Sequence, residues 1–127
     1  ADRIGEGLAG QGKVVRGARI LLVGLAYKRD VDDIRESPAF ALIKILLRRG
    51  ASVDYYDPLV PKVEKTRQFS QPLASIEFSP ERLGQYDVAV IVTDHSAVDY
   101  DTILSAVPLV VDTRNVYRGK HPKVVKA

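Results

Sequence analysis

The chain has 127 residues, of which 46% are hydrophobic and 28% are charged, and its mean hydropathy is -0.07. This length and composition predict one globular domain that has no membrane-spanning segment and buries roughly two thirds of its unfolded surface. The absence of cysteine excludes disulfides, thiolate zinc sites, iron–sulfur clusters and a cysteine nucleophile.

The net charge of +3 is distributed unevenly along the chain. Residues 13–29 carry five basic side chains and no acid, and five more basic side chains follow Asp112, again without an acid. Taken alone, these stretches are compatible both with ordinary solvated surface and with an anion-binding edge. The chain also has no methionine and no signal peptide, which would suit an excised piece of a longer protein or the removal of an initiator before Ala1.

The chain is expected to enter the domain through a helical tail. Residues 2–8 look like the end of a helix that begins upstream, and they carry little apolar surface with which to dock. We therefore assign residues 1–17 to the tail of a connecting helix and a linker, and residues 18–127 to the domain. The almost continuous apolar run at residues 19–24 predicts a first strand that is buried on both faces.

A helix and a second strand are expected after a polar segment. Ser37 is suited to cap the helix, and Pro38 to open it, because proline has no amide donor to lose. Apolar residues continue at helical spacing until Gly50, the expected left-handed cap. Residues 51–56 predict a second strand, which Pro58 ends because proline breaks the hydrogen-bond ladder.

The second half of the chain continues the alternation of strands and helices. Residues 60–72 predict a weak helix at most. The elements expected after them are a short strand at 75–78, a helical turn at 80–83, a strand at 87–93, a helix at 100–106 and a strand at 109–112. Such alternation implies right-handed crossovers and a parallel sheet covered by helices on both faces. The predicted fold class is α/β, a three-layer, Rossmann-like, doubly wound and mostly parallel sheet of about five strands.

The connection after the first predicted strand carries the strongest functional signal. Ligands of open parallel sheets bind outside the carboxyl ends of the strands, near the point where the strand order reverses. Residues 25–36 form an unusually long connection there, since such connections usually have about two to six residues. It contains Lys28 and Arg35 and leads to the Ser37 helix, whose free amides and dipole favour an anion.

Arg114 holds the corresponding position after the last predicted strand, between Thr113 and Asn115. In a doubly wound order these two loops are about two strand spacings, or roughly 10 Å, apart. Long cationic side chains from both loops can therefore converge on one diphosphate. The two acid-free stretches end and begin at this edge, which favours the anion-binding interpretation of the charge pattern.

Three other sites are weighed and disfavoured. The dinucleotide fingerprint is missing, because only Gly24 stands where three spaced glycines would admit a pyrophosphate. Asp57 can mimic the acid that holds a cofactor ribose, but a capping or turn role beside Pro58 is favoured. His95 occupies a strand end where a general base can sit, yet no nucleophile is paired with it, so a role in loop structure is favoured.

No metal site and no nucleic-acid surface is predicted. Asp32 and Asp33 are adjacent and seldom converge, and the neighbouring Lys28 and Arg35 explain their presence better than a metal ion does. The six tyrosines do not form an alternating basic and aromatic stripe, which disfavours nucleic acid despite a pI of about 9.2.

Residues 24–38 read Gly-Leu-Ala-Tyr-Lys-Arg-Asp-Val-Asp-Asp-Ile-Arg-Glu-Ser-Pro. This loop and helix start closely resemble the signature that opens the C-terminal domain of the UDP-glucose/GDP-mannose dehydrogenases. Tyr-Tyr-Asp-Pro at 55–58 and Val-Asp-Thr-Arg-Asn at 111–115 match later family positions in the same order, so the resemblance covers essentially the whole chain. Within this family, the sequence at residues 30–38 and 112–117 resembles the UDP-N-acetylglucosamine/UDP-N-acetylmannosamine 6-dehydrogenase branch more closely than the other branches.

The resemblance implies roles for four residues. Tyr27 and Lys28 would contact the UDP moiety, with Lys28 near the diphosphate, and Arg114 would reach the same nucleotide sugar. Arg35 would reach across to NAD, which family members bind mainly on an N-terminal domain. No catalytic residue and no metal ligand is expected in this chain.

The resemblance also implies what the full-length enzyme does. Family members use NAD to oxidise the C6 alcohol of a UDP-sugar to a carboxylate in two hydride transfers, through a cysteine adduct and a thioester. This chain, without cysteine or a glycine-rich NAD loop, would be the UDP-binding third of such an enzyme and inactive alone. A cytoplasmic enzyme of polysaccharide biosynthesis is expected, with the N-terminal and central domains as partners, a homo-oligomeric full-length form, and no nucleic-acid or membrane partner.

Three alternatives remain open at this point. The chain can be an interdomain or oligomerisation module without its own ligand affinity, or the same domain of a UDP-glucose 6-dehydrogenase. The third alternative is an independent Rossmann enzyme that uses His95, which would transfer hydride without other domains.

Overall fold

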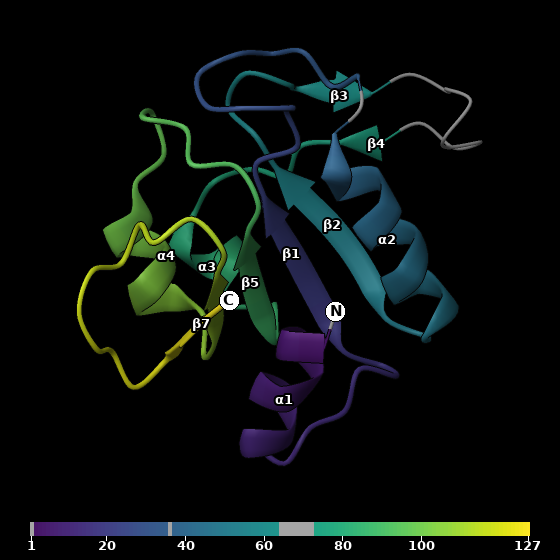
Figure 1. The fold of residues 1–127 in the computed structure, drawn as a ribbon, viewed down its shortest axis with the longest axis vertical. Helices are drawn as coiled ribbons and strands as arrows, with labels where there is room; N and C mark the ends of the chain where they lie inside the picture. Colours follow the sequence, from purple (N-terminus) through teal and green to yellow (C-terminus); the bar gives the residue numbers. More distant parts are fainter. Residues whose placement is uncertain (1, 36, 64–72) are drawn as a thin grey trace.

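The computed structural model describes residues 2–35, 37–63 and 73–127 (Figure 1). Its centre is a sheet of five parallel strands in the order β2–β1–β5–β6–β7. The strands are β1 (Arg19–Val23), β2 (Ser52–Tyr56), β5 (Val88–Ile91), β6 (Val110–Asp112) and β7 (Val124–Lys126). Because β2 and β5 flank β1 on opposite sides, the strand order reverses there, and the predicted doubly wound α/β sheet is confirmed.

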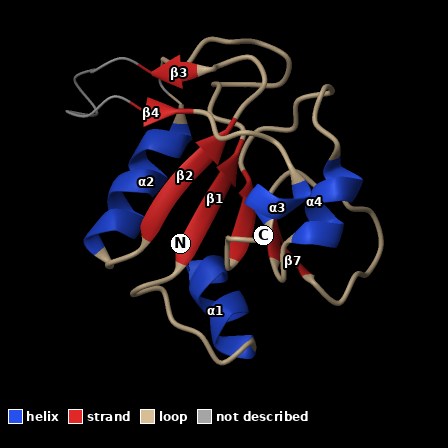
Figure 2. Ribbon diagram, turned by 180° about the vertical axis from the view of Figure 1, so that it is seen from behind, coloured by secondary structure: helices blue, strands red, loops and turns tan. Residues whose placement is uncertain are grey.

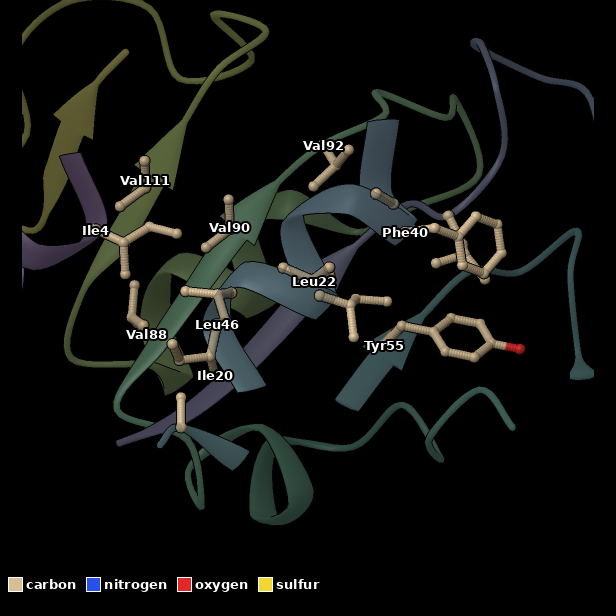
Figure 3. Packing of buried hydrophobic residues seen from close by; sticks show 14 of the residues in the cluster. Ile4, Ile20, Leu22, Phe40, Leu46, Tyr55, Val88, Val90, Val92 and Val111 are labelled. Atoms are coloured by element: carbon tan, nitrogen blue, oxygen red, sulfur yellow. The ribbon is translucent and has the colours of Figure 1, made fainter. Parts of the chain in front are cut away.

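Helices cover both faces of this sheet (Figure 2). They are α1 (Asp2–Gly10), α2 (Pro38–Arg48), α3 (Pro80–Leu83) and α4 (Tyr100–Ala106). Along β1, Ile20 and Leu22 pack with α1 and α2, whereas Leu21 and Val23 pack with α3 and α4. Figure 3 shows the first of these two cores, in which side chains of α1 and α2 meet one face of the strands. The apolar run at residues 19–24 is therefore buried on both faces, as predicted.

The residues that were predicted to begin and end α2 do so in the structure. Ser37 caps the helix, with its hydroxyl oxygen accepting the backbone N–H of Ala39 at 3.2 Å, and Pro38 is the first helical residue. Gly50 follows the helix with a φ of 89°, in the left-handed region that favours glycine. Within the part of the chain that the structure describes, no helix is long and apolar enough to cross a membrane.

α1 is part of the core, which corrects the expectation for residues 2–8. Ile4 and Leu8 are buried, and they pack in the same core as α2. A Cβ atom at Gly7 would lie 3.0 Å from the side chain of Leu109, so this face of the helix approaches the sheet closely. The prediction of little apolar surface was wrong because two apolar residues four positions apart, with glycine between them, suffice to dock a short helix. The boundary at residues 17 and 18 stays a prediction.

Three short strands differ from the sequence-based expectations. β3 (Lys62–Val63) lies where a weak helix was expected and pairs antiparallel with β4 (Leu73–Ala74), which follows that range. Residues 64–72 of the expected helix lie outside the described residues. The strand predicted at 75–78 is reduced to a single bridge between Ser75 and Tyr55. β7 was not predicted, because its burial is only partial and its apolar signal is two valines.

Candidate functional site

The carboxyl ends of β1, β5 and β6 lie at one edge of the sheet (Figure 1). Three connections begin there: residues 24–36 after β1, residues 92–99 after β5 and residues 113–123 after β6. The strand order reverses between β1 and β5, so the predicted position of a ligand site falls at these connections.

The β1 connection begins in close contact with the β5 connection. Gly24 has a φ of 91°, and a Cβ atom there would lie 2.5 Å from the backbone oxygen of Thr93. The hydroxyl of Thr93 in turn donates to the carbonyl oxygen of Ala26 at 2.8 Å. Gly24 is therefore required for the approach of two protein segments, and no space remains beside it for a pyrophosphate.

Asp57, at the end of β2, holds the same connection from the other side. Its buried carboxylate accepts the backbone N–H groups of Leu25 at 2.8 Å and Ala26 at 3.0 Å through one oxygen. The other oxygen accepts the N–H of Leu59 at 2.8 Å, inside the turn that follows β2. The favoured capping and turn role of Asp57 is confirmed, and its carboxylate is enclosed by protein donors.

His95 is completely buried and pairs with Asp57, a contact that the sequence analysis missed. Its Nε2 lies 2.8 Å from a carboxylate oxygen of Asp57, and its Nδ1 accepts the backbone N–H of Asp30 at 2.9 Å. Because Nδ1 accepts, the proton is on Nε2, which donates to Asp57. The favoured interpretation of His95 as a residue of loop structure is confirmed.

Asp30 is the second fixed point of the β1 connection. It adopts a left-handed φ of 58°, and its carboxylate accepts the hydroxyl of Ser96 at 2.6 Å and the backbone N–H of Ser96 at 2.7 Å. These two hydrogen bonds lower the pKa of Asp30 below its ordinary value. The short segment of residues 27–29 therefore lies between two anchored points, Leu25–Ala26 and Asp30.

Tyr27 and Lys28, two of the residues predicted to bind ligand, lie in this segment. Both side chains are exposed, and 48% of the surface of Tyr27 is accessible. The backbone N–H of Tyr27 donates to the carbonyl oxygen of Asp33 at 2.6 Å, which closes the base of the loop. The next residue, Arg29, extends to a cavity beside the β5 and β6 connections.

This cavity has a volume of about 410 Å³ and is predominantly lined by polar groups. Its lining comes from all three connections and from the start of α4: Arg29, Asp94, His95, Ser96, Tyr100, Arg114, Asn115, Val116 and Arg118. Three arginines thus face one acidic residue, which makes the cavity suited to an anion. Arg29 and Arg118 were not predicted as site residues, although both belong to the acid-free stretches of the sequence.

Arg114 is held at the cavity by Asp112, the buried last residue of β6. The carboxylate of Asp112 accepts the backbone N–H groups of Arg114 at 3.1 Å, Val116 at 3.2 Å and Tyr117 at 2.9 Å. Burial by itself would raise the pKa of Asp112, but these N–H groups and the ammonium of Lys126 lower it below its ordinary value. The Nε of Arg114 also donates to the carbonyl oxygen of Val92 at 2.9 Å, which links the β6 and β5 connections.

Arg35 is not among the residues that line this cavity. Its guanidinium makes two hydrogen bonds to the carboxylate of Asp33, Nη2 at 2.9 Å and Nε at 3.1 Å, and its side chain is 86% exposed. The hydrogen bonds from Arg35 lower the pKa of Asp33 to about 2. The structure thus places Arg114 at the cavity and Arg35 outside its lining.

The described residues do not fit a conventional NAD site. The neighbourhood of Gly24 is filled by Thr93, and the Asp57 carboxylate that would hold a ribose is already used by four donors. In the described ranges there is also no group of three or more His, Asp or Glu side chains placed to hold a metal ion.

Comparison with known proteins shows which family the chain resembles. The model of the UDP-glucose/GDP-mannose dehydrogenase family, UDP binding domain, matches residues 21–119. The chain is 36% identical over 116 residues to a UDP-glucose 6-dehydrogenase from Rhizobium meliloti, which covers 87% of this chain and 26% of that protein. It is 34% identical over 106 residues to a UDP-N-acetyl-D-mannosamine dehydrogenase from Methanococcus maripaludis, covering 77% of this chain and 23% of the relative. The chain therefore spans about a quarter of the length of these relatives.

Solved structures agree with the sequence comparison. The fold matches that of the UDP-D-ManNAc dehydrogenase from Pyrococcus horikoshii with a TM-score of 0.76 and 25% identity, over 98% of this chain and 28% of that one. The NDP-N-acetyl-D-galactosaminuronic acid dehydrogenase from Methanosarcina mazei has a TM-score of 0.74 and 24% identity, over 99% of this chain and 27% of that one, and supports the fold alone.

Proposed function

Because the chain belongs to the UDP-glucose/GDP-mannose dehydrogenase family, we propose that it binds the UDP moiety of a nucleotide sugar within a longer dehydrogenase. The observation that carries this proposal is the cavity at the reversal point of the sheet, where Arg29, Arg114 and Arg118 converge from two connections. Guanidinium groups form paired, charge-assisted hydrogen bonds with phosphate oxygens, so three of them suit a diphosphate.

Arg114 is the residue that we assign to the diphosphate first. Its backbone is held by Asp112 and its Nε by the carbonyl of Val92, so its position is set before a ligand arrives. A preorganised cation loses less side-chain freedom on binding than a free one. Among the described residues, the side-chain hydrogen bond of Arg114 uses Nε, which leaves the two terminal nitrogens of its guanidinium for the ligand.

Tyr27 and Lys28 complete the proposed contacts with UDP. They stand on the segment between the anchored residues Ala26 and Asp30, next to Arg29, whose side chain reaches the cavity. The exposed ring of Tyr27 offers an aromatic face to a nucleotide base, and the ammonium of Lys28 offers a mobile positive charge to the diphosphate.

In the longer enzyme we propose an NAD-dependent oxidation of the sugar C6 alcohol to a carboxylate, with NAD as the hydride acceptor. NAD would be held mainly by another domain, since the residues described here lack the conventional site. Arg35, exposed and paired with Asp33, is assigned to reach that cofactor from this domain. The chain would serve the reaction by holding the nucleotide half of the substrate, and it would be inactive alone.

We assign the substrate to the UDP-N-acetylhexosamine class. The sequence at 30–38 and 112–117 supports this choice, as does the likeness to the UDP-D-ManNAc dehydrogenase of Pyrococcus horikoshii. The test is the ratio of kcat/KM for UDP-N-acetylhexosamines and UDP-glucose, measured on the full-length enzyme. A preference for UDP-glucose would overturn the assignment without affecting UDP binding.

Calorimetry with UDP on the 127-residue chain tests the binding function itself. We expect weak but saturable binding that is lost in Arg114→Ala, because the side chain of this residue reaches the cavity from an anchored backbone. Arg3→Ala is the matched control, since Arg3 is exposed on α1, pairs with Glu6 in the same helix and is not among the residues that line the cavity. Absence of binding by folded protein at millimolar UDP would contradict a self-sufficient site.

A further inference from the structure

We propose that His95 and Asp57 form a positioning pair that sets the place of residues 27–29 for ligand binding. The proposal rests on the proposed function, because its consequence for affinity requires that these residues contact UDP. It gives a role to the buried side chains of His95 and Asp57, which have no direct contact with UDP or NAD in the proposed function.

The pair connects both anchored points of the β1 connection. One carboxylate oxygen of Asp57 accepts the N–H groups of Leu25 and Ala26, and the same oxygen accepts from Nε2 of His95. Nδ1 of His95 accepts the N–H of Asp30. A continuous path of hydrogen bonds therefore runs from Ala26 through the pair to Asp30, with both side chains fully shielded from water.

Beside this path, the carboxylate of Asp30 accepts two hydrogen bonds from Ser96 and lies 3.9 Å from Nε of Arg29. Residues 27–29 are exposed, and Tyr27 is tied to the protein through its backbone N–H, which donates to Asp33. The distance between Ala26 and Asp30 thus decides how far residues 27–29 extend toward the cavity. The ring of His95 is completely buried beside that cavity, so a shift of the ring would move the segment through the hydrogen bond to Asp30.

The imidazole is suited to this task because its two nitrogens have opposite roles. Nε2 donates to a carboxylate while Nδ1 accepts from an amide, so each half of the ring fixes one point. A glutamine at this position can retain the donor near Nε2 but not the acceptor near Nδ1. An asparagine can retain the acceptor near Nδ1 but not the donor that Asp57 needs. The two substitutions therefore separate the two halves of the pair.

The experiment compares His95→Gln and His95→Asn in the 127-residue chain. Urea unfolding measures stability, calorimetry measures UDP affinity, and NMR measures amide exchange at Asp30 and the protonation of the His95 nitrogens. We expect His95→Gln to bind UDP about tenfold more weakly than wild type, with faster exchange at Asp30, because a positioning hydrogen bond is lost. His95→Asn should bind closer to wild type although it leaves Asp57 short of one donor and is less stable.

A purely structural role predicts a different pattern, in which affinity follows stability in every variant. Tyr86→Phe is the control for this possibility, because it removes the 2.6 Å hydrogen bond to Asp54 of β2, and neither residue is among those that line the cavity. It should lower stability and leave UDP affinity unchanged. Wild-type affinity in both His95 variants, or a protonated Nδ1 in the wild-type chain, would overturn the positioning role.

Failure of the proposed function would give a distinct result. If the wild-type chain does not bind UDP, the binding proposal falls, but amide exchange at Asp30 and the nitrogen signals of His95 still test the pair. Unchanged Asp30 exchange in His95→Gln would then reject the positioning role by itself.

Discussion

A Cβ atom at Gly24 would lie 2.5 Å from the backbone oxygen of Thr93, so the connections that follow β1 and β5 are in direct backbone contact. This contact brings the start of the β1 connection against the β5 connection. The residues of the β5 connection that follow Thr93, Asp94 to Ser96, line the cavity that Arg29, Arg114 and Arg118 also line. The site is therefore built around an approach that only glycine allows.

Gly24→Ala is expected to destabilise the chain by about 3 kcal/mol or to prevent folding, because alanine would combine a left-handed φ with a clash against backbone. Urea unfolding measures the loss. Gly12→Ala is the matched control, since Gly12 has a φ of 73° but no atom within 4 Å of the added Cβ. It should cost about 1 kcal/mol, and an equal cost at both positions would contradict the contact.

Asp57→Asn should lower the free energy of unfolding by about 3 kcal/mol, because the amide nitrogen cannot accept the hydrogen bonds that the buried carboxylate receives. The loss is measured by urea unfolding at neutral pH. Asp32→Asn, at an exposed position of the β1 connection, is the control and should change stability by less than about 0.5 kcal/mol. A cost for Asp57→Asn as small as that of the control would show that the enclosure of this carboxylate does not matter.

The chain should lose stability in acid, and Asp112 should account for part of the loss. Because its pKa is lower in the folded than in the unfolded chain, its contribution is present above the unfolded value, about 3.9, and disappears as the pH falls through the folded value. Urea unfolding at a series of pH values below 5 measures this slope. Asp112→Asn should be less stable at neutral pH and should show a shallower slope; an unchanged slope would refute the assignment.

Lys28→Ala should weaken UDP binding by roughly ten- to a hundredfold, the equivalent of a charge-assisted hydrogen bond of about 1.5 to 3 kcal/mol. Stability should not change, since the side chain is exposed. Lys44→Ala removes an exposed lysine from α2 and serves as the control in calorimetry. Equal affinity of the two variants would remove Lys28 from the proposed site.

Much of this architecture could be predicted because its signals are local. The apolar runs of β1 and β5 identify strands buried on both faces, and Ser37, Pro38 and Gly50 mark the ends of α2. The rule that ligands bind beyond the carboxyl ends of parallel strands pointed to two of the three connections that line the cavity, and to Arg114 in one of them. Where the local signal is weak, the prediction failed: the helix at residues 2–8 was expected but its docking on the core was not, and β7 was not predicted.

The partners within the site could not be predicted in the same way. Arg29 and Arg118 belong to the charged stretches, but their direction depends on the path of each loop. Asp57 and His95 stand 38 positions apart, and nothing in the sequence near either residue indicates the other.

The sequence alone determined the main alternation of strands and helices, two of the three connections that line the cavity and the family to which the chain belongs. Only the tertiary structure decided which side chains meet there: that Asp57 binds His95, that Thr93 fills the space beside Gly24 and that Arg114 reaches the cavity. The reason is physical. Helix caps, apolar runs and the Arg35–Asp33 pair act over a few neighbouring residues, whereas the contacts of Asp57 with His95, of Gly24 with Thr93 and of Arg114 with Val92 exist only once β2, β1, β5 and β6 lie side by side in one sheet.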